Sequence, residues 1–459
     1  MDEPACPGCR ALLQRIAALE ARVAELTRRL EDATRAGKRQ AAPFRKGPPQ
    51  DQPRTPGRKA GAAHGTHGHR QPPPPEQLDE VHHAALPPAC PDCGGRVDET
   101  HVACQYQVEL PRRSVHRQFH VHVGQCRQCG QRVQGRHPLQ TSAALGAAAA
   151  QLGPDLQAAI VVLNKRAGLA HGKISRTLRD LFGISVTRGA CPQVVLRAGR
   201  HCQPTYTAIE EATRTAAWLV PDETGWRIGG RPAWLHAWVG PQATCYAIDP
   251  KRSADRLQVV IGRDWDGVLI HDGFESYDRF QQALHQQCVA HLLRRADELL
   301  ASARGGAVRF PRQVQALLRA GLADRARLTT AGAEPEVWET IRWQRTVELA
   351  ALLERPKTHP GNAALAGHLA AHLDEWFTFL EVPGLDATNW RAEQAIRPAV
   401  VNRKVWGGNR TAAGATAQAV LTSVLATCQR QARSALDYVS QTLRGWATAL
   451  LPAQALAMR

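Results

Sequence analysis

The chain has 459 residues, enough for about two to four folding units, and its 58 Lys and Arg against 41 Asp and Glu give a formal net charge of +17. Such a basic protein attracts polyanions, so nucleic acid is the first partner to consider, with a merely soluble basic protein as the alternative. The start of the chain lacks the basic and apolar regions of a signal peptide, and no apolar run is long enough to span a membrane, so we expect a soluble cytoplasmic protein.

The N-terminal stretch has the spacing of a short coiled coil. Apolar residues recur at alternating intervals of four and three positions, with Arg and Glu between them, at Leu12, Ile16, Leu19, Val23, Leu26 and Leu30. This is a heptad seam, so residues 10–36 are expected to pair two or more copies of the chain. A single amphipathic helix packed on its own chain is the alternative.

A basic segment rich in Pro and Gly occupies residues 37–80, and its composition cannot bury a core, so it is expected to be a flexible linker. The 12 cysteines of a cytoplasmic protein are reduced, and their spacing then indicates metal binding or packing before disulfides.

Two Cys-x-x-Cys pairs, CPDC and CRQC, are each followed by a glycine, and each pair directs two thiolates to one point. The alternating stretches QYQVEL and VHRQFHVHV between them predict the strands of a hairpin that joins the pairs. We therefore expect a zinc ribbon over residues 86–138, with structural Zn²⁺ on Cys90, Cys93, Cys126 and Cys129. Two buried, reduced cysteine turns are the alternative, and the half-site of Cys6 and Cys9 stays unassigned.

Helical spacing begins at Gly153-Pro154, and we expect residues 150–205 to form a helical segment. A second helix over KISRTLRDLF is expected to end at Gly183, and a third follows after a short turn. A helix, a turn with glycine and a basic helix are compatible with a helix-turn-helix DNA-binding segment, although ordinary helical pairs share the pattern.

A set of strands comes next. The apolar run AAWLV predicts a buried strand with Asp222 at its end, WRIGGRPAWLHAWVG a Gly-Gly hairpin, and TCYAID a third strand. After a crossover helix over SADRLQVVIG, the run DGVLIHDG ends a fourth strand at Asp272. This is the strand order of a ribonuclease-H-like α/β core, in which the ends of the first and fourth strands lie side by side.

Asp222 and Asp272 should therefore meet, and like charges repel unless a cation lies between them. Oxygen ligands of this kind suit Mg²⁺ or Mn²⁺. Glu393, on a predicted helix, supplies a third carboxylate, and the basic side chains around it suit DNA phosphates: Arg391, Arg397, Arg403, Lys404 and Arg410. The alternative is that Glu393 only forms an exposed ion pair with Arg397 one turn later.

The segments DETGW, IHDGFESYDRF, CVAHLLRRADEL and NWRAEQAIRPAVVNRKVWGGNR together resemble the IS66 family of insertion-sequence transposases. The resemblance implies a DDE-type enzyme in which Asp222, Asp272 and Glu393 are the catalytic triad and bind two Mg²⁺ ions. It also implies a supporting Cys-x-x-His signature at Cys288 and His291. The catalytic domain would span residues 214–450, with an α-helical insertion at about 295–385.

The function expected from these features is transposition. The enzyme would cleave insertion-element ends and join the 3′-hydroxyl to target DNA by two-metal in-line phosphoryl transfer. Its partners would be element and target DNA, a second copy of the chain, and accessory transposition proteins, in the bacterial cytoplasm at the nucleoid. A structure-specific nuclease on the same sheet, or a non-catalytic zinc-containing DNA-binding regulator, are the alternatives.

Overall fold

The computed structural model describes residues 15–16, 18–27, 72–108, 114–140, 142–146, 151–252, 254–382 and 384–451. The chain forms two units, Met1–Pro111 and Arg112–Arg459, and each is considered by itself. No helix in these described ranges is long and apolar enough to cross a membrane.

The first unit contains part of the predicted coiled coil. Residues 18–27 are helical, and the seam side chains at Ile16, Leu19, Val23 and Leu26 are 48–62 % exposed. Leu12, Leu30, most of the predicted linker, Cys6 and Cys9 lie outside the described residues. Within the described helix, the seam thus presents its apolar side chains to solvent, and self-association stays a prediction.

The second Cys-x-x-Cys pair lies in a hairpin of the second unit, between β1 (Val123–Gln125) and β2 (Arg132–Gln134). The strands predicted over QYQVEL and VHRQFHVHV are wrong for most of their length, since residues 105–108 and 115–122 are not in strands. Alternation predicts a strand only where one face is buried, and Val108 and Val115 are instead 74 % and 68 % exposed.

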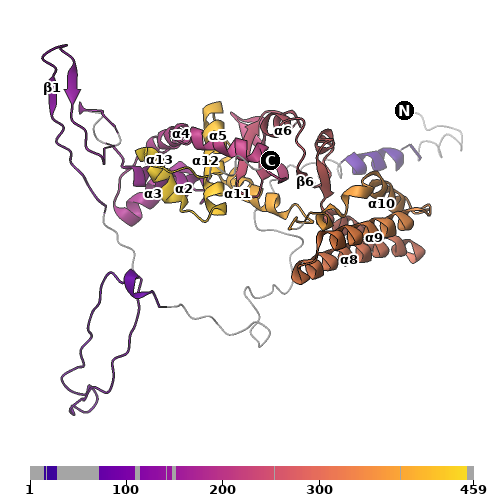
Figure 1. Cartoon of the computed structure of the whole chain (residues 1–459), viewed down its shortest axis with the longest axis horizontal. Helices are drawn as coiled ribbons and strands as arrows, with labels where there is room; N and C mark the ends of the chain where they lie inside the picture. The colour runs from indigo at the N-terminus through magenta and orange to yellow at the C-terminus, as the bar shows by residue number, and fades with distance from the viewer. Residues whose placement is uncertain are drawn as a thin grey trace, which may run out of the picture. The chain divides into compact units, whose positions relative to one another are not determined.

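A mixed five-stranded sheet, of which Figure 1 labels β6, forms the centre of the second unit, and its strand order is β5-β4-β3-β6-β7. The neighbours β3, β4 and β5 are antiparallel, whereas β6 runs parallel to β3 and β7 parallel to β6. The strands are β3 (Trp218–Ile228), β4 (Arg231–Val239), β5 (Thr244–Asp249), β6 (Val268–His271) and β7 (Leu284–Gln287).

The predicted order of three strands, a crossover helix and a fourth strand is confirmed. Gly229 and Gly230 form the predicted hairpin with φ values of +57° and +80°, which glycine adopts without steric cost. The crossover helix is α6 (Ala254–Ile261). One detail was wrong: β3 does not end at Asp222 but continues to Ile228, because β4 pairs with it along that whole length.

Helices cover both faces of the sheet. Leu219 and Leu269 pack in a core with α2 to α6, α12 and α13, whereas Val220 and Ile270 pack in a core with α7 to α10. Since successive strand residues point to opposite faces, the two cores lie on opposite faces of the sheet. The helices are α2 (Pro154–Lys165), α3 (His171–Phe182), α4 (Ala190–His201), α5 (Gln203–Arg214), α7 (Val289–Ser302), α8 (Arg309–Ala331), α9 (Pro335–Leu353), α10 (Pro360–Ala371), α11 (Trp390–Trp406), α12 (Ala412–Arg430) and α13 (Ala435–Arg444).

The helix α11 packs across β3 and β4, where Ile396 and Ala399 contact the cluster of Trp226 and Leu235. Trp226 lies an even number of residues from Val220, so α11 covers the same face of the sheet as α7 to α10. Asp222 shares that face, and the residue that follows it, Glu223, points to the opposite one.

Candidate active site

Strand register brings the two predicted aspartates together. In the parallel pair of β3 and β6, Trp218 is opposite Val268 and Leu219 is opposite Leu269. Each pair joins residues fifty positions apart, so the same register continued by three residues places Asp222 beside Asp272, immediately after β6.

Asp222 lies in an environment that disfavours its charged form. Burial, together with the nearby charges of Glu223, Asp272 and Glu393, raises the pKa of its carboxyl group to about 7. The N–H of Glu223, which donates to Asp222 Oδ1 at 2.8 Å, opposes this rise. The charges of both other predicted triad members therefore act on this one side chain.

Asp272 begins a tight turn at the end of β6. Its Oδ1 accepts a hydrogen bond from the N–H of Phe274 at 3.2 Å. Gly273 between them has a φ of +88°, and a Cβ there would come within 2.9 Å of Gln287 Oε1, so the turn requires glycine. The turn leaves the Asp272 side chain exposed at the edge of a cavity of about 220 Å³, which Arg294 and Arg295 of α7 also line.

Glu393 lies in the first turn of α11, and its side chain is exposed. Its Oε1 is 3.8 Å from His291 Nε2, and no ion pair joins it to Arg397, although both residues are described. The structure therefore does not contain the alternative interaction considered for Glu393, an exposed ion pair with Arg397.

Cys288 connects the two ends of this site. Its N–H donates to the carbonyl of His271 at 2.8 Å, and its Sγ accepts from the N–H of Asn389 at 3.5 Å. His271 directly precedes Asp272, and Asn389 is the residue before α11, which contains Glu393. Cys288 thus contacts the backbone next to Asp272 through its N–H and the backbone at the start of α11 through its Sγ.

The second residue of the opening acidic pair, Glu223, has a different role. It is 6 % exposed, Arg252 donates to its Oε1 at 2.7 Å, and the hydroxyl of Tyr277 donates to its Oε2 at 2.8 Å. Tyr277 lies in η4 (Glu275–Arg279), just after Asp272. This network ties β3 to the segment after β6, and the sequence analysis missed it because its members are far apart in the chain.

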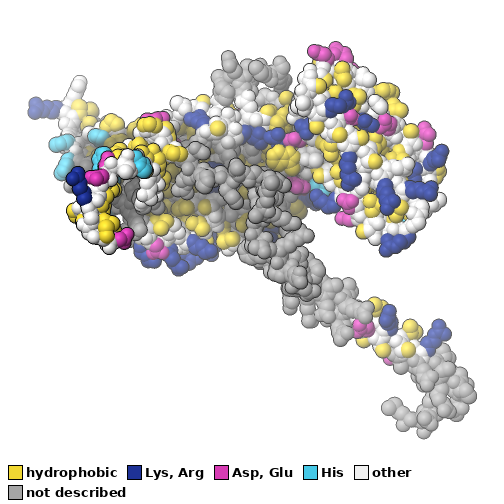
Figure 2. Space-filling model, turned by 90° about the horizontal axis from the view of Figure 1, so that it is seen from below, with side chains coloured by type: hydrophobic (Ala, Val, Ile, Leu, Met, Phe, Trp, Pro, Cys, Tyr) yellow, Lys and Arg dark blue, Asp and Glu magenta, His cyan; other side chains and the backbone are white. Residues whose placement is uncertain are grey.

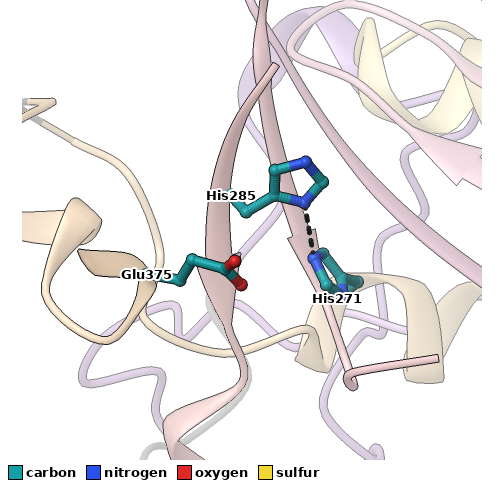
Figure 3. Close-up of side chains that lie close together, drawn as sticks. All are labelled: His271, His285 and Glu375. Atoms are coloured by element: carbon teal, nitrogen blue, oxygen red, sulfur yellow. Dashed lines mark hydrogen bonds between the residues drawn. The ribbon is translucent and has the colours of Figure 1, made fainter. Parts of the chain in front are cut away.

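His271, which directly precedes Asp272, lies close to His285 and Glu375 (Figure 3). The N–H of Gly273 donates to Nδ1 of His271 at 3.2 Å, so the proton of this neutral ring is on Nε2, which donates to Nδ1 of His285 at 2.9 Å. His285 Nε2 then donates to the carbonyl of Phe280 at 3.0 Å.

Every ring nitrogen of the two histidines in this chain of hydrogen bonds has a partner without a metal. Burial keeps the pKa of His271 well below its usual range, which agrees with a neutral ring. Glu375 is held separately, accepting from Gln287 Nε2 at 2.6 Å. The cluster therefore stiffens the turn at Asp272 and is complete as a hydrogen-bonded structure.

The predicted phosphate-binding residues divide into two groups. Arg397, Lys404 and Arg410 are exposed, and among the described residues their side chains have no hydrogen-bond or ion-pair partner. Arg403 instead donates to the carbonyl of Gly225 and to Thr224 Oγ1, and Arg391 pairs with Asp386, so these two are held by the protein. Figure 2 shows further Lys and Arg side chains spread over the lobe of α8 to α10.

The two Cys-x-x-Cys pairs have the same local geometry. Gly94 N–H donates to the Cys90 carbonyl and Gly130 N–H to the Cys126 carbonyl, both at 2.9 Å, and both glycines have φ above +70°. In each turn, backbone N–H groups donate to the first thiol and lower its pKa, for Cys90 as for Cys126. A lowered thiol pKa favours the thiolate that zinc requires.

Oxygen ligands at the meeting point of Asp222, Asp272 and Glu393 fit a hard divalent cation. A nearby positive charge would stabilise the charged form of this half-buried carboxyl, and no Lys or Arg forms an ion pair with Asp222 among the residues that the structure describes. The donor set therefore suits Mg²⁺ or Mn²⁺.

Comparison with known families gives one match. Residues 149–417, more than half of the chain, match the model of a family described as "Transposase IS66 family", and the matched range contains all three carboxylates. No curated protein matches the chain.

Proposed function

Since the chain belongs to the IS66 family of DDE-type transposases, which act in DNA transposition, we propose that Asp222, Asp272 and Glu393 are its catalytic triad. The observation that carries this proposal is the pairing of β3 with β6, whose register leads to Asp222 and Asp272, together with the raised pKa of Asp222. Strongly shifted pKa values are concentrated at functional sites, where burial and neighbouring charges adjust side chains to their chemical task.

The five-stranded mixed sheet is the support for a ribonuclease-H-like catalytic core. Its strand order places the antiparallel β5, β4 and β3 on one side and the parallel β6 and β7 on the other. The carboxylates come from the central strand, its parallel neighbour and a C-terminal helix on one face. We take the segment from α7 to α10 as the inserted helical part of this core.

In the proposed reaction, Asp222, Asp272 and Glu393 hold the divalent cations. The metal ions that these carboxylates would hold would supply Lewis-acid activation of the attacking water or 3′-hydroxyl and stabilisation of the leaving oxygen, in cleavage of an element end and in joining of its 3′-hydroxyl. Asp222 is central because the other two charges both act on it. Glu223, Arg252 and Tyr277 keep β3 and the turn after Asp272 in place.

The DNA strand is bound by the exposed cations of α11 in this proposal. Glu393, Arg397 and Lys404 are separated by four and seven positions, which places them on one stripe of the helix. A phosphate bound by Arg397 would therefore lie one turn from the third carboxylate. The arginines beside Asp272, Arg294 and Arg295, add positive charge on the other side of the site.

The remaining parts serve binding and assembly. The zinc ribbon with Cys90, Cys93, Cys126 and Cys129 and the helices of residues 150–205 would bind the element ends, while the heptad seam would pair two chains so that both ends enter one complex.

A strand-transfer assay tests the proposal. Full-length protein with Mg²⁺ is mixed with labelled terminal repeats and a supercoiled plasmid, and joining of the label to the plasmid is expected for the wild type. Asp222→Asn, Asp272→Asn and Glu393→Gln, nearly isosteric, should each abolish cleavage and joining while DNA affinity is kept. Label cleavage without joining would favour a structure-specific nuclease, and near-native joining by any variant would remove that residue from the triad.

A further inference from the structure

A basic pocket lies beside α11, and none of the three proposed triad residues lines it. Its volume is about 420 Å³, within the range of roughly 300–1,000 Å³ that is usual for small-ligand sites. It is formed by the end of α2, by β4 and β5, and by α11 and α12. Its charged lining residues are Lys165, Arg166, Arg391 and Arg430, and no Asp or Glu lines it.

Lys165 is the most unusual of these cations, since it is only 5 % exposed. Its Nζ donates to Gln418 Oε1 at 2.6 Å and lies 5.4 Å from the centroid of the Trp406 ring. No carboxylate pairs with it among the described residues. A neutral amide and an aromatic face replace only part of the water around an ammonium group, so burial lowers the pKa of Lys165 to about 7.

Arg430 adds a second incompletely paired cation. Its Nε is buried and has no hydrogen-bond partner in the described part of the chain, and its other contact is a 3.4 Å hydrogen bond from Nη1 to the carbonyl of Pro241. Burial and the charge of Arg391 both lower the pKa of Arg430. Of the four lining cations, Arg391 alone has a carboxylate partner, Asp386, in the described residues.

The other lining groups suit a ligand with both polar and apolar parts. Pro398, Ala399 and Leu425 provide apolar contact, while the amides of Gln394 and Gln429 can donate and accept hydrogen bonds. The wall of the pocket is also tightly packed. Gly168, just after α2, has a φ of +71°, and a Cβ at this position would overlap the side-chain oxygen of Asn402, which lines the pocket. These features distinguish the pocket from a packing defect.

We propose that this pocket binds the phosphate group of a nucleotide, with Lys165 and Arg430 as its cationic partners and the amides of Gln394 and Gln429 contacting the adjoining sugar or base. A phosphate bound there would be the negatively charged partner that Lys165 and Arg430 lack among the described residues. The phosphate can belong to a DNA strand or to a free nucleotide, because both present the same group. The inference does not depend on the triad.

Calorimetric titration of the full chain at neutral pH, in chelator so that no metal-dependent step contributes, tests this proposal. The probes are thymidine 5′-monophosphate, thymidine without phosphate, and a single-stranded oligothymidylate of about 12 nucleotides. Lys165→Met keeps the length of the side chain but not its charge, and Arg430→Gln removes the second cation. Arg319→Gln on α8, an exposed position away from the lining, is the matched control.

A phosphate-bearing probe should bind the wild type and Arg319→Gln equally, and bind Lys165→Met and Arg430→Gln about tenfold more weakly. Thymidine should not bind. If the pocket variants lose affinity for thymidine 5′-monophosphate, the ligand is a free nucleotide. If they lose affinity only for the oligonucleotide, the ligand is a phosphate of a DNA strand. The proposal is overturned if both pocket variants, folded by circular dichroism, bind both probes as the wild type does. Triad variants that keep both this binding and near-native strand joining would count against the proposed function alone.

Discussion

The backbone N–H of Asn389 donates to the Sγ of Cys288 over 3.5 Å, while the N–H of Cys288 itself donates to the carbonyl of His271. Cys288 therefore contacts Asn389, at the start of the helix that contains Glu393, through its side chain, and His271, the residue before Asp272, through its backbone N–H. Burial raises the pKa of the Cys288 thiol, so it is protonated at neutral pH and accepts the hydrogen bond as a neutral group.

Replacing Cys288 should affect catalysis more than binding. Cys288→Ala removes a hydrogen bond worth about 1 kcal/mol and leaves α11 free to shift relative to β6, so strand transfer should fall by about tenfold or more while DNA affinity stays unchanged. Ala290→Ser, two residues later in the first turn of α7, is a control for disturbance of the helix. Equal losses of joining and of thermal stability in both variants would leave Cys288 without a special role.

The ionised carboxylate of Asp222 should lower the free energy of unfolding of the metal-free protein. Its pKa is 3.8 in the unfolded chain and about 7 in the folded one, so between these values the folded state holds a proton that the unfolded state has lost. Stability should therefore fall as pH rises from 4 to 7 and stay low above pH 7, at a cost of about 1 to 4 kcal/mol.

The variant Asp222→Asn lacks this ionisation, so in chelator its melting temperature should exceed that of the wild type above pH 7, with the difference shrinking toward pH 4. Adding Mg²⁺ should raise the melting temperature of the wild type and close the gap. Differential scanning calorimetry across this pH range measures both effects. A pH-independent difference would mean that Asp222 is not strained by burial.

The basic residues of α11 should divide into those that bind DNA and one that stabilises the fold. Arg397→Ala and Lys404→Ala remove exposed cations with no protein partner, so each should weaken duplex binding and reduce the slope of log K against log salt by up to about 0.9. Arg403→Ala removes a contact to Gly225 and should lower the melting temperature, with the salt slope preserved. Fluorescence anisotropy at several salt concentrations separates the two outcomes.

Zinc should be present at one ion per chain in protein prepared without chelator. Cys90→Ser or Cys126→Ser should release it, because each removes a thiol whose pKa the backbone already lowers toward the thiolate. Cys104→Ser, an exposed cysteine outside both pairs, should keep the metal. Atomic emission measurements that find no zinc in the wild type would contradict the zinc-ribbon prediction.

Self-association should depend on the N-terminal seam. Val23 is 62 % exposed in the described helix and lies in the middle of the heptad pattern, so Val23→Asp should place a charge where two chains meet and shift the sedimenting species toward the monomer. Arg22→Asp, beside it but off the seam, controls for the charge itself. Unchanged sedimentation of Val23→Asp would show that the seam pairs no second chain.

Local signals were sufficient to predict the core of the fold. The Gly229-Gly230 hairpin and the apolar runs before Asp222 and Asp272 depend on neighbouring residues, and all of them appear in the structure. Features set by distant partners were not visible. The continuation of β3 past Asp222 depends on β4, and β7 (Leu284–Gln287), a strand of the five-stranded sheet, carries too few apolar residues to be recognised.

The same reasoning applies to the site. Carboxylates at the ends of apolar runs could be identified from their surroundings in the sequence, but the role of Glu223 could not, because its partners Arg252 and Tyr277 lie 29 and 54 positions later. Nor could the sequence distinguish Arg403 from Lys404. One faces the carbonyl of Gly225 and the other faces solvent, and only the packing of α11 on β3 separates them.

The N–H of Val289 donates to the carbonyl of Ala387 at 3.0 Å, so the segment between them leaves the sheet and returns to it at almost the same place. In evolutionary terms, such a closed loop can gain or lose whole helices without changing the spacing between Asp272 and Glu393 in three dimensions. The number of residues between the second and third carboxylates is therefore free to vary, because the bond between Val289 and Ala387 closes the loop at its base whatever its length.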